Sequence, residues 1–149
     1  MRKNGPVTAF YLETLLLIVV FIGIILLLTQ VFGMAQMQSA AAKQLTDAVV
    51  LAGNAAEAFS ASKSPEELLE RLNENNNAVA LTDTAGVEAV YGNDLSPDSS
   101  GCYRVSVTWQ PEQTETGTMV SGGIRVMAAG KAEPVYHLET KVFLQEAAG

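Results

Sequence analysis

Few side chains in this sequence are of the types that catalyse reactions or bind metals. The chain has one histidine, His137, and one cysteine, Cys102, which excludes a Cys/His metal cluster and an internal disulfide. His137 lies on the polar side of a predicted strand, which favours a solvent-facing residue over a catalytic base. No partner histidine is identifiable for Cys102, which we interpret as a structural thiol. The sequence therefore predicts no catalytic residue, no metal and no cofactor, and the chain is not expected to be an enzyme.

Two further groups of residues, a set of glutamates and a pair of glycines, could bind a ligand, and each group has a simpler interpretation. Glutamates recur along a short predicted helix at positions 66, 67, 70 and 74, but they lack the spacing of a calcium loop and are typical of a solvated face. The pair Gly122-Gly123 lacks the spacing of a phosphate-binding loop. Within a predicted strand, it favours a bulge or close packing.

Charge divides the sequence into two parts. The 149 residues fit one ordinary domain with an appendage, and a content of 48% hydrophobic residues excludes a disordered chain. Residues 1–43 hold three basic residues and one acidic residue, a net charge of +2, whereas residues 44–149 hold six basic and fifteen acidic residues, a net charge of -9. This acidic balance argues against nucleic-acid binding.

The more basic part contains a long apolar segment. No charged residue occurs from Thr14 to Ala42, and Thr29 and Gln30 are the only polar residues between positions 15 and 33. A membrane-spanning helix needs about 20 mostly apolar residues. Because this segment is apolar on every side of a helix, we expect it to contact lipid or other apolar helices. The sequence predicts a single membrane span.

Basic residues determine the expected orientation of the span. Arg2 and Lys3 precede it, and the next basic residue is Lys43. The positive-inside rule places the N-terminus in the cytoplasm and the residues after about position 34 outside it. A cleavable secretory signal is the alternative, with Gly33-Met34-Ala35 as its small-x-small site. The apolar run is longer than the usual signal core, which favours an uncleaved span.

The residues after the span keep a helical pattern, and we expect one helix from Phe10 to Ala61. No proline occurs between positions 34 and 62, and an apolar stripe is formed by Leu45, Val49, Ala52, Ala56 and Phe59. A new helix is then expected at Ser64-Pro65-Glu66-Glu67, where Ser64 is the predicted N-cap and Glu67 completes a capping box.

The C-terminal half alternates apolar and polar residues with the period of β-strands. The alternation covers 103–109, 124–128 and 136–144. Turns are expected between Pro111 and Thr118 and at Gly130-Lys131, and a shorter hairpin is expected from 78–81 and 87–91, around Asp83. Such a sheet needs a cover for its apolar face, and the helix stripe is the available one. We predict an α+β fold, with a long N-terminal helix packed on a small antiparallel β-sheet.

We therefore divide the chain into four segments. Residues 1–9 are a cytoplasmic leader or N-terminal tail, and residues 10–34 are the transmembrane half of the long helix. Residues 35–62 are its amphipathic exported half. Residues 63–149 are an exported α+β head with a three-stranded antiparallel sheet.

This arrangement resembles type IV pilins and type II secretion pseudopilins. The motif is carried at the start of the span by Ala9-Phe10-Tyr11-Leu12-Glu13, and the resemblance covers about the first 60 residues. It implies a leader that a prepilin peptidase removes near Thr8, Ala9 or Phe10, and helices that pack into a filament extracted by an assembly motor. It also implies that Glu13 pairs with the N-terminal amine of a neighbouring subunit. Glu13 is the fifth residue of a chain that starts at Ala9 and the fourth of one that starts at Phe10.

The sequence leaves more than one function open. The leading hypothesis is a pilin-like structural subunit of a type IV pilus, type II secretion or competence-like assembly at the bacterial cell surface. Its partners are membrane lipid and other pilin-like subunits, in homo- or hetero-oligomers, with Phe10 and Glu13 setting the register. The alternatives are a single-pass, surface-anchored interaction module that does not polymerise, a tight-adherence pilin-like protein and a secreted enzyme. Glu13 can also be interpreted as a carboxylate that reaches the lipid headgroups and complements the helix dipole.

Overall fold

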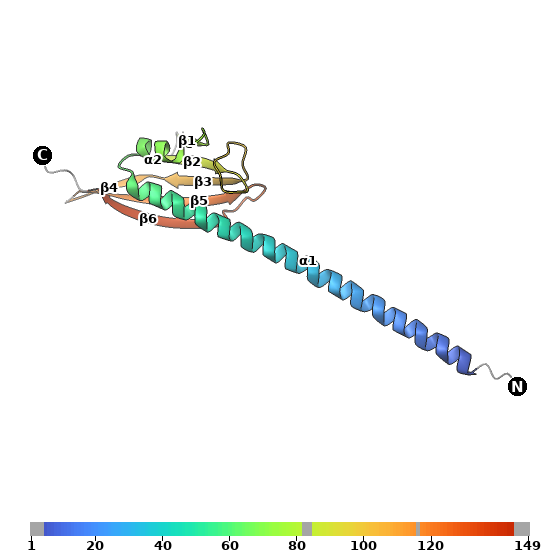
Figure 1. Cartoon of the computed structure of the whole chain (residues 1–149). Helices are drawn as coiled ribbons and strands as arrows, with labels where there is room; N and C mark the ends of the chain where they lie inside the picture. The colour runs from blue at the N-terminus through green and yellow to red at the C-terminus, as the bar shows by residue number, and fades with distance from the viewer. Residues whose placement is uncertain (1–4, 82–84, 116, 145–149) are drawn as a thin grey trace. The chain divides into compact units, whose positions relative to one another are not determined.

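The computed structural model describes residues 5–81, 85–115 and 117–144. Two helices, α1 (Gly5–Ala61) and α2 (Pro65–Leu72), precede the strands (Figure 1). The strands are β1 (Ala78–Leu81), β2 (Gly86–Tyr91), β3 (Tyr103–Thr108), β4 (Gln110–Thr114), β5 (Gly117–Ala128) and β6 (Tyr136–Leu144). The chain divides into a first unit, residues 1–42, and a second unit, residues 43–149. Helix α1 contributes residues to both units, and each unit is described by itself.

The first unit consists of the apolar part of α1, which begins at Gly5 rather than at the predicted Phe10. Its large apolar side chains, from Val7 to Met37, are 47% to 76% exposed. The hydroxyl groups of this segment are satisfied within the helix, because Thr14 Oγ1 donates to the carbonyl of Phe10 and Thr29 Oγ1 to that of Ile25, both at 2.9 Å. A helix in lipid must satisfy its polar groups internally, and these bonds meet that requirement.

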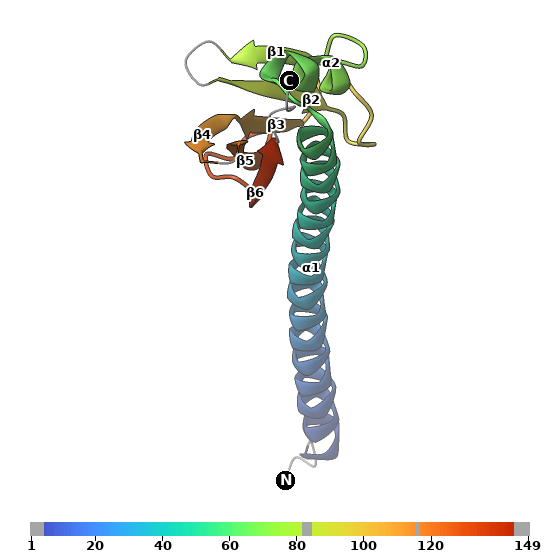
Figure 2. The same ribbon diagram turned by 90° about the vertical axis from the view of Figure 1, so that its left-hand side faces the viewer.

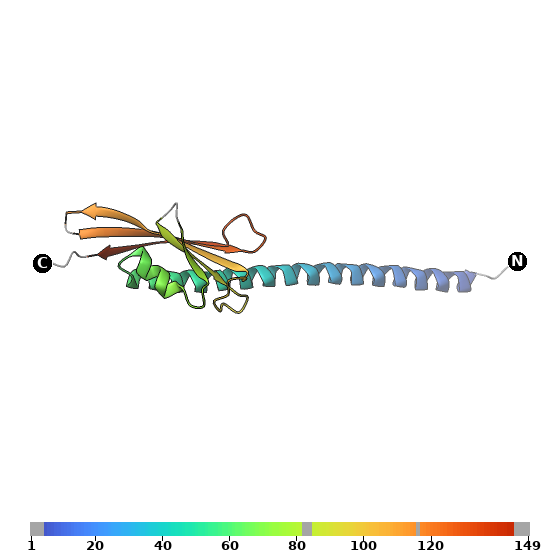
Figure 3. The same cartoon turned by 90° about the horizontal axis from the view of Figure 1, so that it is seen from above.

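The second unit is a six-stranded antiparallel sheet covered on one face by helices. Strand order is β1-β2-β3-β5-β4, and β6 pairs with the other side of β5. Seen in the two further views, the C-terminal part of α1 and all of α2 lie on the same face of the sheet (Figures 2 and 3). The α+β fold predicted from the sequence, with a long N-terminal helix on a small antiparallel sheet, is confirmed.

The sheet is larger than the predicted three strands. The hairpin of β1 and β2 is confirmed, and residues 82–84, including Asp83, lie outside the described residues. Strand β4 occupies most of the expected turn between Pro111 and Thr118, which was a wrong prediction. It continues β3 in the same register along β5, from Gln110 opposite Ser121 to Thr114 opposite Gly117. All of its residues are exposed, so it has no apolar alternation, and a proline is tolerated on such an edge strand.

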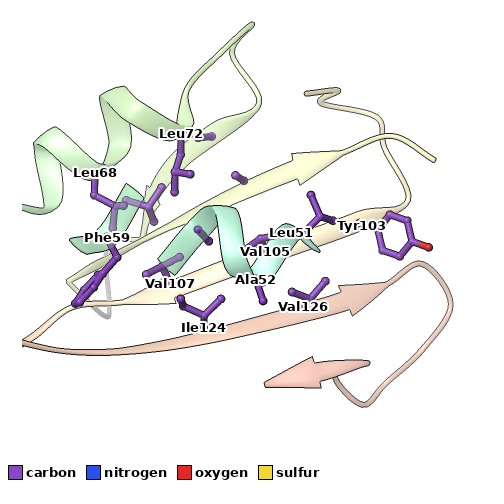
Figure 4. Close-up of a cluster of buried hydrophobic side chains, with 14 of the residues drawn as sticks. Leu51, Ala52, Phe59, Leu68, Leu72, Tyr103, Val105, Val107, Ile124 and Val126 are labelled. Carbon is purple, nitrogen blue, oxygen red and sulfur yellow. The ribbon is translucent and has the colours of Figure 1, made fainter. Parts of the chain in front are cut away.

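The core lies between α1, α2 and the inner face of the sheet (Figure 4). Alternate residues of β3 and β5 are buried there, as the period of two predicted, and they include Val105, Val107, Ile124 and Val126. Phe59 of α1 is fully buried, and its ring centroid lies 4.9 Å from that of Trp109.

The buried stripe of α1 differs from the predicted one. Leu45 and Val49 are 48% and 43% exposed, whereas the helix positions turned to the sheet are Ala48, Leu51, Ala52, Ala55 and Phe59. Both sets fit a helical period. The observed set contains three alanines, whose small side chains let the α1 backbone approach the sheet, and packing decides between the two faces.

Helix α2 begins as predicted at its capping residues. Ser64 is the N-cap, and its hydroxyl accepts a hydrogen bond from the Glu67 backbone N–H at 3.2 Å. The return bond of the capping box is shifted by one residue, because the Glu67 carboxylate accepts from the N–H of Lys63 at 2.9 Å. Leu68 and Leu72 are buried, and Asn73 is the C-cap.

Candidate assembly surface

The aromatic and acidic residues at the start of α1 share a strongly exposed helix surface. Phe10 is 66% exposed and its ring packs edge-on against Tyr11, with ring centroids 6.3 Å apart. Glu13 lies three residues after Phe10, which places both on one side of the helix. Among the described residues, the Glu13 carboxylate has no hydrogen-bond or ion-pair partner, and it is exposed. The structure therefore brings Phe10 and Glu13 together and leaves the carboxylate available to a group from another molecule.

The three residues near the expected cleavage point are already helical. Thr8, Ala9 and Phe10 all lie within α1, and their side chains are exposed. Ala9 lies four residues before Glu13, so both project from the same side of the helix. An amine at Ala9 or Phe10 of a neighbouring chain is thus the chemical group that this surface is suited to pair with Glu13. Cleavage and the role of Glu13 stay predictions.

A carboxylate at this position gains little from the helix dipole and is costly in lipid. Helix α1 begins at Gly5, so Glu13 lies about two turns inside it, beyond the first turn in which a negative charge complements the dipole. In the middle of a bilayer, an ionised carboxylate costs about 2.5–3.5 kcal/mol on insertion scales, which a pairing cation offsets. Glu13 is the only charged residue between Lys3 and Lys43 in the sequence. Whether it pairs with another chain therefore depends on whether lipid or water surrounds the carboxylate.

A second uncovered surface lies on the part of α1 that belongs to the second unit. Leu45, Val49 and Val50 are each 43% to 48% exposed. On a helix of 3.6 residues per turn, Val49 and Val50 lie away from the buried positions of α1 and Leu45 lies on the flank of the buried stripe. Gly53 adds no bulk there, and a Cβ at this position would meet nothing within 4 Å. We call Leu45, Val49, Val50 and Gly53 the outer strip of α1. Sequence reasoning assigned Leu45 and Val49 to the core, and therefore missed this strip.

A polar cluster joins α1 to the sheet next to the outer strip. The Asp47 carboxylate accepts hydrogen bonds from Lys43 Nζ at 2.7 Å and from the Tyr103 hydroxyl at 3.0 Å. The Lys43 hydrogen bond and, to a lesser extent, that of Tyr103 hold the pKa of Asp47 below its usual value. Burial and the hydrogen bond to Asp47 raise the pKa of Tyr103 to about 12. The stripe predicted from the sequence omits Asp47, because a carboxylate on a helix gives no sign of a tyrosine partner far along the chain.

The other residues considered from the sequence lie apart from these surfaces. His137 is exposed on β6, and Cys102 is a half-buried free thiol directly before β3. Gly122 packs closely against α1, as predicted, since a Cβ there would lie 2.7 Å from the Phe59 ring. Among the described residues, no group of three or more His, Cys, Asp or Glu side chains could hold a metal ion.

The apolar helix is the strongest functional observation in this chain. Among the described residues, α1 is long and apolar enough to cross a membrane, and it lies near the N-terminus. Comparison of the chain with protein-family models, curated proteins and solved structures finds no match.

Proposed function

We propose that this chain is a pilin-like structural subunit of an envelope-spanning assembly of the type IV pilus, type II secretion or competence type. The observation that carries the proposal is the exposed surface of α1, which is apolar on every side over residues 15–28 and uncharged from there to residue 42. Near its start it bears the carboxylate of Glu13, which is unpaired among the described residues. Such a helix is stable in lipid as a single span, and equally against copies of itself. The subunit acts by packing, and its partners are lipid and other pilin-like subunits.

The outer strip of α1 supports the same function. An anchor that never associates has no need for uncovered apolar residues beyond the span, where water surrounds it. Leu45 and Val49 are nearly half exposed, although the same helix buries its opposite side on the sheet. Full burial of a fully exposed leucine or valine contributes about 1.5–3 kcal/mol, and these half-buried side chains can gain about half of that, so contact of this strip with a neighbouring helix would add to the affinity between subunits.

Glu13 supplies specificity in this proposal. Helices that are apolar all round can slide along one another, because each axial offset buries a similar surface. Pairing of one carboxylate with the N-terminal amine of a neighbour favours a single offset, since every other offset leaves a charge unpaired in an apolar environment. Mass spectrometry of the mature N-terminus tests the chemistry: a chain that begins at Ala9 or Phe10 provides the required amine, and an intact Met1 contradicts the pairing.

Cross-linking between neighbouring helices tests the assembly. In a Cys102→Ser background, single cysteines at the consecutive positions 34–37 sample all sides of α1, because an α-helix has 3.6 residues per turn. We expect cross-linked dimers in membranes for at least one position. Glu13→Gln, which keeps the size of the side chain and removes its charge, should insert normally and lose most of the cross-linked product.

The control for this experiment is Glu57→Gln, which removes an exposed carboxylate from α1 in the second unit. It should cross-link like the unmodified sequence. Equal cross-linking of Glu13→Gln and Glu57→Gln would remove Glu13 from the mechanism. Absence of cross-links at every position would favour the non-polymerising anchored module instead.

A further inference from the structure

The face of the sheet turned away from the helices is not covered by any other described element. Alternate side chains of β3, β5 and β6 point to this outer face, and they include the imidazole of His137 and the charged groups of Arg104, Arg125, Glu139 and Lys141. Arg104 lies 3.5 Å from Glu88 of β2 and is paired. Arg125 and Lys141 are exposed and have no carboxylate partner among the described residues. Two free cations therefore lie on the β5 and β6 part of this face.

A polar hollow of about 340 Å³ lies between these cations. It exists because Gly123 has no side chain: β5 places Ser121 and Arg125 on either side of it, and β6 places Glu139 opposite. His137 lies opposite Arg125, and Lys141 lies opposite Ser121. The Gly123 backbone is fixed by Thr108, whose hydroxyl accepts from its N–H at 2.9 Å. Glu139 also lines the hollow, so its charged side chains are two cations and one carboxylate, a net charge of +1. Arg125, Lys141, Ser121 and the imidazole of His137 supply donors, and the excess of positive charge favours a further carboxylate.

The opposite edge of the sheet carries the complementary charge. Helix α2 packs on β1 and β2, and its exposed carboxylates are Glu66 and Glu70, with Glu74 directly after the helix. Glu67 is paired with Arg71 at 2.8 Å. Glu66, Glu70 and Glu74 have no basic partner among the described residues. We call these three residues the acidic edge.

The two charged regions cannot meet within one molecule. Strands β2, β3 and β5 separate β1 from β6, and the views from two sides place α2 and β6 at opposite edges of the sheet (Figures 1 and 2). Unpaired charges of opposite sign at opposite edges favour a contact between unlike surfaces of two copies. Contacts of that kind repeat from copy to copy and produce rings or filaments instead of closed dimers.

We propose that the hollow around Gly123 receives the acidic edge of a second copy of this chain, so that neighbouring second units join head to tail. The inference rests on the proposed function, which supplies copies side by side. The binding energy of this head-to-tail contact is modest, because exposed ion pairs contribute little and are screened by salt. The contact mainly determines specificity, since like-charged edges that face each other are disfavoured.

Disulfide ladders test this contact in the full-length chain in membranes. In the Cys102→Ser background, Ser121→Cys marks the hollow and Glu70→Cys marks the acidic edge. A chain that carries both cysteines should form a ladder of oligomers with oxidant or a short bismaleimide, while each single variant should give none. Arg125→Glu with Lys141→Glu should abolish the ladder, and so should Glu66→Lys with Glu74→Lys. The four charge changes together should restore it.

A matched control moves one cysteine out of the hollow. Thr114→Cys with Glu70→Cys uses an exposed residue of β4 instead of Ser121 and should give no ladder. A ladder that is insensitive to charge reversal, or dimers from either single variant, would overturn the proposal. If the ladder is absent while the cross-links at positions 34–37 persist, the head-to-tail contact is wrong and the proposed function stands. If both are absent, the proposed function fails with it.

Discussion

At the scale of single residues, Asp47 shows how one polar side chain fixes a helix on a sheet. It is 9% exposed, and its carboxylate receives Lys43 from one helical turn earlier and Tyr103 from the first residue of β3. A buried carboxylate is costly unless it is paired and hydrogen-bonded, and here both requirements are met. The Tyr103 bond also favours the side of α1 that faces the sheet, because rotation of the helix would break it.

Tyr103→Phe should lower the free energy of unfolding by about 1 kcal/mol at neutral pH, because Asp47 loses a hydrogen bond. The variant should also behave differently in alkali. The folded state raises the pKa of Tyr103 from 10.0 to about 12, so between these values the unfolded chain releases a proton that the folded chain retains. The contribution of Tyr103 to stability is therefore complete below pH 10 and is lost as pH rises through the folded pKa.

Denaturant unfolding at a series of pH values, together with phenolate absorbance, measures both effects. The unmodified chain should show a tyrosine that titrates near pH 12 and a fall in stability toward that pH. Tyr91 contributes to both, because burial raises its pKa as well, so both should be smaller in Tyr103→Phe and missing when Tyr91→Phe is added. Tyr136→Phe is the control, because Tyr136 is half-buried and has no hydrogen bond to Asp47 among those described. A late phenolate signal of unchanged size in Tyr103→Phe would contradict the assignment.

At the scale of elements, the sequence predicts those helices and strands in which the spacing of apolar residues matches the residues that are buried. The alternation in β3 and β5 and the cap at Ser64 lie where expected, because each needs only local rules. The buried face of α1 could not be predicted in full, since Val49 and Leu51 each fit a helical stripe and only the sheet selects between them. Strand β4 was missed because its five residues are all exposed and lack alternation.

The candidate site likewise contains residues that the sequence identifies and residues that only the structure brings together. Glu13 and Phe10 could be singled out from the sequence, because a charge beside a long apolar segment is conspicuous. The hollow around Gly123 could not, since its donors come from two strands, β5 and β6, and meet only through the register between them. Gly122 lies between these cases: its strand position predicted close packing, and the structure identifies Phe59 as the partner.

Gly122→Ala tests the fit between α1 and the sheet. The added methyl group would lie 2.7 Å from the ring of Phe59, which is fully buried and packs on Trp109. Overpacking of this kind costs about 1–3 kcal/mol. Gly53→Ala is the matched control, because its Cβ meets open space on the helix surface, and it should stabilise by about 0.5–1 kcal/mol. Trp109 fluorescence during denaturant unfolding reports both, and equal effects of the two substitutions would contradict close packing at Gly122.

At the scale of the whole molecule, the uneven distribution of charge gains a structural meaning. The net charge of +2 belongs to residues 1–43, and the net charge of -9 belongs to residues 44–149, which closely match the second unit. Within the second unit the charge is again divided, since the acidic edge lies by β1 and β2 and two unpaired cations lie on β5 and β6. The first division bears on membrane orientation and the second on contacts between copies.

Membrane orientation follows from the first division. Arg2 and Lys3 precede an uncharged span, so we expect the N-terminus to stay in the cytoplasm and the second unit to be outside. In the Cys102→Ser background, Ser99→Cys places a thiol on an exposed residue of the second unit. A membrane-impermeant maleimide should label this variant in intact cells, and labelling only after lysis would contradict the orientation.

The cause of the orientation is tested by moving the charges. Arg2→Glu and Lys3→Glu remove the positive charge before the span, and Gln36→Lys and Gln38→Lys place positive charge after it. Because basic residues near the ends of a span determine which end is retained, this variant should expose Ser99→Cys in fewer molecules. The same four positions changed to alanine are the control, since they alter size and polarity without adding a charge after the span. Equal labelling of the charge-moved and unmodified chains would mean that the second unit crosses the membrane regardless of these residues.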